Sequence, residues 1–186
     1  MRHYEDHSLR WIVLYKTLHH RQVEDVPCQL SRSTIIQAFH QHSLMIRAIY
    51  PGFHIITNQP IDSCSTAFSI RNPESDVITN CSLFSLDDRL GLEIQVGLGM
   101  RIACQWTIHS RNKGSDIGFT KQTEEGSISQ RRKTSDSPSD IYLVEETKFD
   151  LLRPLDRLAR TNSNKSKSLE NILIFLERLK KGEIQL

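Results

Sequence analysis

The clearest pattern of hydrophobic and polar positions lies in residues 90–108, LGLEIQVGLGMRIACQWTI. Apolar side chains occupy the even positions, and polar or small residues occupy most of the odd ones. Strict alternation is typical of a β-strand with one face in a core and the other in water. A single strand of this length would extend about 60 Å at about 3.3 Å per residue, which is too long for a small domain. We therefore predict two strands joined as a hairpin.

Parity fixes the position of the turn in this hairpin. If both strands keep their even-numbered residues in the core, the two residues that close the loop differ by an even number. The three-residue loop Gly97-Leu98-Gly99 meets this condition, whereas a two-residue loop does not. Such loops favour a left-handed residue at their end, a conformation that Gly99 adopts without steric cost. The sequence therefore predicts that Val96 pairs with Met100.

Weaker patterns predict the elements that precede the hairpin. Residues 9–18 indicate a strand with apolar side chains on both faces, which favours a central position in the sheet. Residues 19–31 indicate a connector. Apolar residues at three- and four-residue steps predict one helix over residues 33–50, capped by Ser33 or Thr34. Short strands separated by turn sequences are then expected at 53–57, 66–70 and 77–84, and Asp87-Asp88 is the last of these turns.

The last part of the chain indicates a short strand and two helical segments. Residues 141–146 favour a strand that returns to the sheet, and residues 149–160 are amphipathic but interrupted by Pro154. A final helix is expected, capped by Ser168 and terminated by Gly182. Its stripe suits either packing on the sheet or contact with a membrane or partner, and consists of Leu169, Ile172, Leu173, Leu176 and Leu179.

These patterns divide the 186 residues into three parts. We expect a sheet-plus-helix core over 1–110, a mobile linker or loop over 111–140, and a short strand with basic C-terminal helices over 141–186. The linker is expected because apolar periodicity almost disappears there. The predicted fold class is α+β: a mostly antiparallel sheet of five to six strands, with one helix packed on it and helices at the C-terminus.

Candidate chemistry is sparse. The four cysteines form no CxxC motif and no short cysteine–histidine pair, and His40 and His42 would point about 160° apart on a helix. We therefore expect buried free thiols, no metal site, no cofactor, no catalytic residue and a non-enzymatic protein. A solvent-accessible cleft in which histidine, cysteine and carboxylate groups converge would contradict this interpretation.

Positive charge is concentrated towards the C-terminus. Residues 151–181 carry eight basic and three acidic residues, a net +5, whereas the whole chain is +2. Such a segment is attracted to anionic lipid headgroups or nucleic acid. The predicted contact residues are Lys165, Lys167, Arg178, Lys180 and Lys181. A regulatory or nuclear-import segment, in which phosphorylation would reverse the local charge, is predicted at Arg131, Arg132, Lys133, Ser135 and Ser137.

The order of the elements, with FHIITNQPI after the first helix and RLGLEIQVGLGMRIACQW in the hairpin, resembles the matrix proteins of rhabdoviruses, particularly the plant-infecting ones. The resemblance covers residues 9–57 and 88–109 and implies no site residues. It implies a viral structural protein that bridges nucleocapsid and membrane and self-associates. The expected partners are a nucleocapsid protein or nucleoprotein complex, an anionic membrane surface, a second copy of the chain, and RNA.

The expected location follows from the same resemblance and from the N-terminal sequence. The resemblance places the protein in the virion, in the host cytoplasm and at the inner membrane face, with the nucleus as a further site. The polar start and the absence of about 20 consecutive apolar residues argue against secretion. The alternative function is a viral accessory or movement protein that binds RNA or a host factor.

Overall fold

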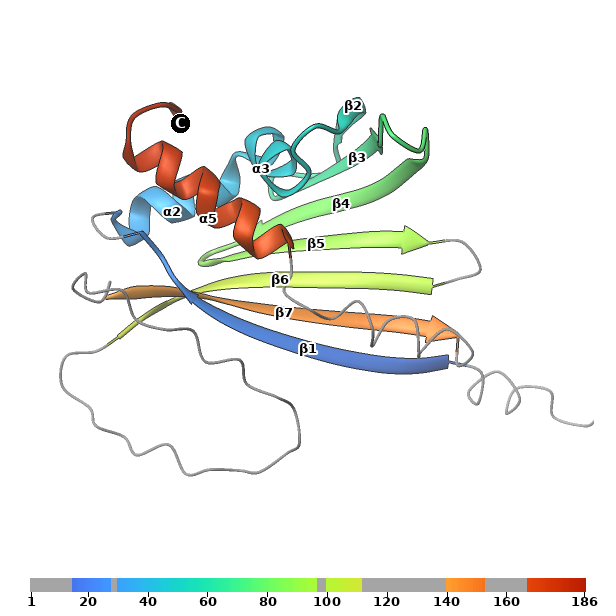
Figure 1. Ribbon diagram of the computed structural model, residues 1–186, viewed down its shortest axis with the longest axis horizontal. Helices are drawn as coiled ribbons and strands as arrows, with labels where there is room; N and C mark the ends of the chain where they lie inside the picture. Colours follow the sequence, from blue (N-terminus) through green and yellow to red (C-terminus); the bar gives the residue numbers. More distant parts are fainter. Residues whose placement is uncertain (1–14, 28–29, 97–99, 112–139, 153–166) are drawn as a thin grey trace, which may run out of the picture.

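Seven antiparallel strands form one sheet in the computed structural model, which describes residues 15–27, 30–96, 100–111, 140–152 and 167–186. The strand order is β1-β7-β6-β5-β4-β3-β2, so β1 and β2 are the edges. All three helices in these ranges lie against one face of the sheet (Figure 1). The strands are β1 Tyr15–Asp25, β2 His54–Pro60, β3 Ser65–Arg71, β4 Ile78–Leu86, β5 Arg89–Val96, β6 Met100–Ser110 and β7 Ile141–Leu152, and the helices are α2 Arg32–His40, α3 His42–Ile49 and α5 Lys167–Lys180.

The predicted fold class is therefore wrong in its number of elements. A sheet of five to six strands with one packed helix was expected, whereas the described residues form seven strands, and α2, α3 and α5 all contribute buried residues to the core. The additional extended residues lie where polar side chains hide the alternation, chiefly in β1 and in the second half of β7.

The predicted hairpin is confirmed. β5 and β6 pair in the register Val96↔Met100 and Leu90↔Trp106, as parity required. The even positions at the open end of this hairpin, away from the turn, form the centre of the core: Leu90, Leu92, Trp106 and Ile108 are each at most 1% exposed. Towards the turn the same face opens, and Val96 is 38% exposed. The helices therefore cover only one end of the hairpin.

The first strand differs most from expectation. β1 runs from Tyr15 to Asp25, so HHRQVED is strand rather than connector, while residues 9–14 lie outside the described residues. β1 pairs only with β7 and is an edge strand, not a central one. An edge strand tolerates polar residues on both faces, which is why the polar half of β1 gave no periodic signal.

The single helix expected over 33–50 is two helices. The backbone of Gln41 leaves the helical region at φ −89° and ψ 70°, which ends α2 and begins α3. Ser31, rather than Ser33 or Thr34, is the N-cap of α2, because its hydroxyl accepts a hydrogen bond from the Thr34 backbone N–H at 3.1 Å. The break lets Phe39 and Met45, both 0% exposed, reach the same core.

Candidate functional site

A cavity of about 660 Å³ lies between the sheet, the end of α3 and the first turn of α5. We call it the α5 cavity. Figure 1 shows the start of α5 above the middle strands of the sheet. Its described apolar lining comes from four parts of the fold and consists of Ile49, Tyr50, Pro51, Phe53, Ile94, Ile102 and Phe149.

Strand register explains how polar residues reach the same cavity. On β7 the apolar residues Ile141, Leu143 and Phe149 set the face that points to the helices, and alternation then turns Glu145 and Thr147 inward. Thr147 lies opposite Cys104 on β6 and His20 on β1, which places these three residues in one row across the sheet. The described polar lining is His20, Cys104, Glu145, Thr147, Lys167, Ser168 and Asn171.

Glu145 is the most deeply buried polar group of the cavity, at 0% exposed. Trp106 Nε1 donates to Glu145 Oε2 at 2.8 Å, and Thr147 Oγ1 donates to Glu145 Oε1 at 3.1 Å. Ser168 Oγ on α5 donates to Oε2 at 3.4 Å. These three neutral donors fix the carboxylate at the base of the cavity and tie the start of α5 to β7.

A further hydrogen bond holds the first turn of α5 in place. Asn171 Nδ2 donates to the Ile49 carbonyl at 3.0 Å, which connects α5 to the end of α3. His20 also lines the cavity, and its Nε2 is buried and has no hydrogen-bond partner among the described residues. A buried polar atom without a partner costs about 1–3 kcal/mol.

Histidine, cysteine and carboxylate side chains therefore line one cavity. The sequence did not predict such a convergence, because it indicated a scaffold without a functional site. Burial raises the pKa of the Cys104 thiol to about 11, with a side-chain hydrogen bond to Thr147 opposing the rise and the nearby Glu145 adding to it. Burial also raises the pKa of the Tyr50 hydroxyl. These shifts favour the protonated forms of both groups at neutral pH.

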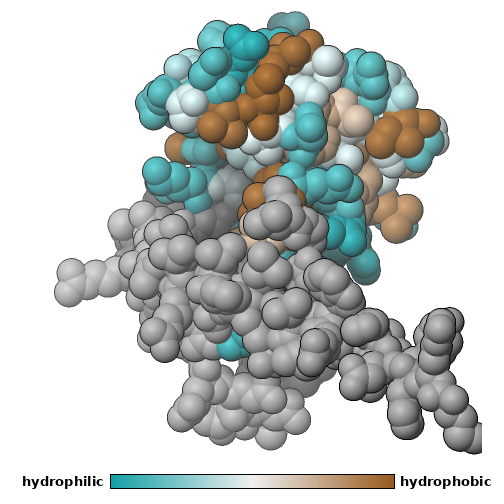
Figure 2. Space-filling model, turned by 90° about the vertical axis from the view of Figure 1, so that its right-hand side faces the viewer, coloured by the Kyte–Doolittle hydropathy of each residue, from teal (hydrophilic) through white to brown (hydrophobic). Residues whose placement is uncertain are grey.

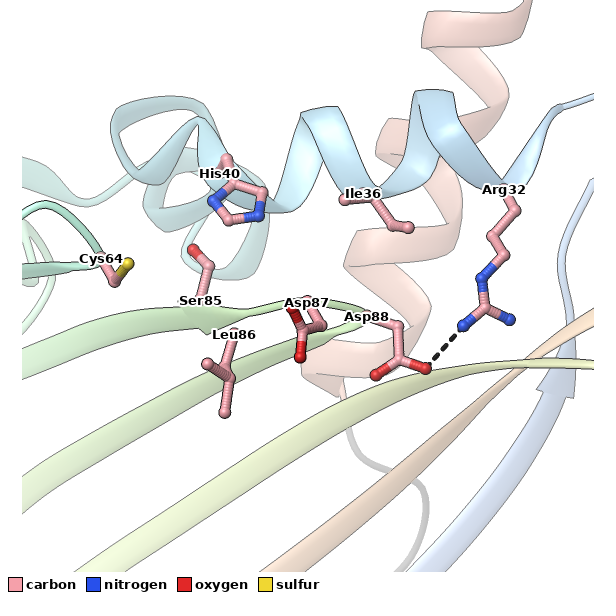
Figure 3. A pocket seen from close by; sticks show the side chains of 8 residues that line it. All are labelled: Arg32, Ile36, His40, Cys64, Ser85, Leu86, Asp87 and Asp88. Carbon is pink, nitrogen blue, oxygen red and sulfur yellow. Dashed lines mark hydrogen bonds and ion pairs between the residues drawn. The ribbon is translucent and has the colours of Figure 1, made fainter.

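A second hollow of about 630 Å³ lies between α2 and the β4–β5 turn. Figure 3 shows Arg32 of α2 pointing to Asp88, and the two form an ion pair at 2.6 Å. His40, Cys64, Leu86 and Asp87 on its walls are all exposed. Because its charges are paired or solvated, this hollow holds no group that needs a ligand. The α5 cavity is the stronger candidate.

The predicted anionic-contact residues do not form one patch. Lys167 is the first residue of α5 and lines the cavity, whereas Arg178, Lys180 and Lys181 lie at the other end of the helix. There, Arg178 pairs with Glu183 at 3.1 Å and Lys181 with Glu177 at 3.7 Å. Lys165 and the predicted regulatory residues Arg131, Arg132, Lys133, Ser135 and Ser137 lie outside the described residues.

Sequence reasoning missed the residues that define the α5 cavity. It assigned no role to Glu145 or Glu146, and β7 turns the first inward and the second outward to pair with Arg21 at 3.7 Å. The available signal was the alternation Ile141, Leu143, Phe149, which fixes the inward face of the whole strand. His20 gave no signal, because it was assigned to a connector.

Within the described ranges, no group of three or more histidine, cysteine, aspartate or glutamate side chains is placed to hold a metal ion. No helix in the same ranges is long and apolar enough to cross a membrane.

No protein-family model matches the chain, and a search of curated proteins found no match. Among solved structures, the chain is similar to norcoclaurine synthase from Thalictrum flavum in complex with dopamine and hydroxybenzaldehyde, at 12% identity and a TM-score of 0.53 over 93% of this chain and 90% of that one. It is also similar to a Deinococcus radiodurans protein, at 9% identity and a TM-score of 0.46 over 89% and 98%.

The likeness to norcoclaurine synthase shows that the seven strands and three helices form a Bet v1-like fold. At 12% identity it shows the fold alone. The expectations of a matrix function, a virion location, nucleocapsid and membrane partners, self-association and the absence of catalysis stay predictions.

Proposed function

We propose that this protein binds a small, largely apolar molecule in the α5 cavity. The observation that carries the proposal is a cavity of about 660 Å³ with a fully buried carboxylate at its base. Ligand sites typically enclose about 300–1,000 Å³, with mostly hydrophobic walls and a few placed polar groups. The α5 cavity has both features.

The walls support an aromatic or aliphatic ligand. Tyr50 and Phe53 form a tilted pair with ring centroids 5.3 Å apart, and Ile94 lies directly opposite Ile102 on the neighbouring strand. Such side chains bind apolar groups by burial, at about 25 cal/mol per Å² of apolar surface. Norcoclaurine synthase, which shares the fold, has a structure in complex with two small aromatic compounds, dopamine and hydroxybenzaldehyde.

The exposed apolar surface is a weaker candidate for a binding site than the α5 cavity. Exposed aliphatic side chains such as Ile61 and Val77, at 62% and 56%, are found in the connections between strands. On the side shown in Figure 2, hydrophobic surface lies in separate patches divided by hydrophilic atoms rather than in one continuous band. Scattered exposed apolar residues are normal on soluble surfaces, so the cavity carries the functional argument.

Titration with N-phenyl-1-naphthylamine, an uncharged dye that fluoresces in apolar surroundings, tests this proposal. The wild-type protein is expected to bind it saturably at one site. Ile94→Trp, which fills the cavity, should weaken binding at least about tenfold, at a stability cost of about 1–3 kcal/mol for overpacking.

The matched control is Ile174→Trp, which adds the same ring at a position of α5 that is 53% exposed. It should leave dye binding unchanged, with circular dichroism confirming that both variants fold. Absence of saturable binding to the wild type, or equal binding by the two variants, contradicts the proposal.

A further inference from the structure

We infer that the α5 cavity selects ligands that carry a protonated amine, and that Glu145 is the residue that binds it. This inference rests on the proposed function, because it names the chemical class of the ligand in the same cavity.

Exposed carboxylates in the described residues commonly have a basic partner. Asp25 pairs with Arg111 at 2.6 Å, and Glu146 pairs with Arg21 at 3.7 Å. Glu145 is 0% exposed, yet it forms no ion pair with any basic side chain in the described ranges. Burying an uncompensated charge costs several kcal/mol, so the one carboxylate that most needs a cation lacks one within this part of the chain.

The hydrogen bonds of Glu145 do not use all of its acceptor positions. Its donors are Trp106 Nε1, Thr147 Oγ1 and Ser168 Oγ, all of them neutral. A carboxylate has about four lone-pair directions, so one direction stays available beside these three. The neutral donors orient the carboxylate without cancelling its charge.

The surroundings favour a cation over a neutral group. The apolar walls of the cavity lower the local dielectric constant, and a charge pair is stronger there than in water. His20 lies opposite Thr147, two residues from Glu145 on the strand, and its buried Nε2 has no partner in the described residues. In the tautomer protonated at Nδ1, this nitrogen accepts a hydrogen bond from an ammonium group at the same end of the cavity.

Lys167, in the same cavity, is the residue that would favour an anionic ligand instead. It lines the cavity but is itself exposed, as the first residue of α5. An anionic ligand would therefore have its charge at the solvated rim, where a charge pair contributes only about 0–1 kcal/mol. The buried carboxylate is the stronger determinant, and the preference for an amine follows.

Three competitors with the same apolar chain separate these possibilities: octylamine, octanoate and 1-octanol, each displacing N-phenyl-1-naphthylamine at pH 7. We expect octylamine to displace the dye at concentrations at least about tenfold lower than the other two, the factor typical of a charge-assisted hydrogen bond. Glu145→Gln should abolish this preference while dye and 1-octanol binding stay within about twofold of wild type.

The matched control is Glu146→Gln, which makes the same change on the next residue of β7, where the side chain is 60% exposed on the other face of the sheet. It should retain the preference for octylamine. If octanoate displaces the dye best, Lys167 governs selection, and if all three competitors act alike, the buried charge does not select; either result overturns the inference with the proposed function intact. Failure of the dye to bind the wild type overturns the proposed function instead. The wild-type ranking tests the preference for an amine even if Glu145→Gln does not fold.

Discussion

His42 shows how a single polar residue joins two layers of the fold. Its Nδ1 lies 2.8 Å from Thr66 Oγ1 on β3, and its Nε2 bonds to Ser85 Oγ on β4. Ser85 is buried and donates to the Phe39 carbonyl at 3.1 Å. Since the Ser85 proton is used there, His42 Nε2–H donates to Ser85, and Nδ1 accepts from Thr66. The neutral ring therefore completes the network.

Stability is expected to depend on the protonation of His42. Burial lowers the pKa of His42 below its usual 6.5, His40 lowers it further, and Asp62 opposes the shift. Because the unfolded chain then binds the proton more readily than the folded one, the contribution of His42 is present above pH 6.5 and is lost as pH falls below it. Urea unfolding at pH 7.5 and pH 5.5 should show a larger loss of stability for wild type than for His42→Gln. Equal losses would contradict this role, and His54→Gln, on an exposed residue of β2, is the control.

Gly91 marks a residue-scale limit of sequence reasoning. Alternation correctly placed Gly91 on the face opposite the core, but it did not predict the aromatic ring that covers this residue. A Cβ at Gly91 would lie 1.9 Å from Phe84 Cζ, so the ring of the directly paired residue occupies the space that a side chain would need. Cross-strand aromatic cover of a glycine depends on which residues pair, and the β4–β5 register was not evident from either strand alone.

At the scale of elements, α5 was predicted well because its information is local. The stripe residues Leu169, Ile172 and Leu176 are each at most 1% exposed, which shows that the helix packs on the core. Gly182, with φ +73°, ends it: Gly182 N–H donates to Leu179 O and Glu183 N–H to Arg178 O, both at 3.0 Å. Periodicity and a terminal glycine suffice to locate such a helix.

Substitutions on the two faces of α5 should separate packing from surface effects. Leu176→Ala, at a 0% exposed position, is expected to lower the free energy of unfolding by about 2–5 kcal/mol, because it leaves a cavity in the core. Ile174→Ala, at a 53% exposed position, should change it by no more than about 0.5 kcal/mol. Urea unfolding measures both. Similar losses for the two variants would show that α5 does not pack through its stripe.

At the scale of the whole molecule, the sheet edge and the α5 cavity could not be predicted for one shared reason. β1 and β7 pair over 11 positions from Tyr15↔Leu152 to Asp25↔Tyr142, although more than 100 residues separate them in the chain. Local patterns cannot reveal such a pairing, and both strands are rich in polar residues. Since His20 and Glu145 meet only through this pairing, the site was invisible until the topology was known.

The β6–β7 hairpin provides a test of the predicted division of the chain. The pairing of these strands continues to Ser110↔Ile141, and Arg111 N–H donates to Asp140 O at 2.7 Å, so the ends of the intervening segment 112–139 are already adjacent. A four-residue glycine–serine linker can therefore replace that segment. Each halving of a flexible loop lowers the entropic cost of closure by about 0.6 kcal/mol, and shortening 28 residues to four is nearly three halvings, so we expect the short-linker variant to gain about 1.7 kcal/mol in unfolding free energy.

An equal-length glycine–serine replacement of 112–139 distinguishes loop length from loop sequence. If the segment is only a linker, this variant should match wild type in urea unfolding and in binding of N-phenyl-1-naphthylamine, and only the short linker should be more stable. If the sequence of 112–139 contributes contacts to the folded domain, both variants should lose stability. That result would show that residues 111–140 belong to the core domain, because a segment without contacts contributes to unfolding only through the entropy of closing its loop.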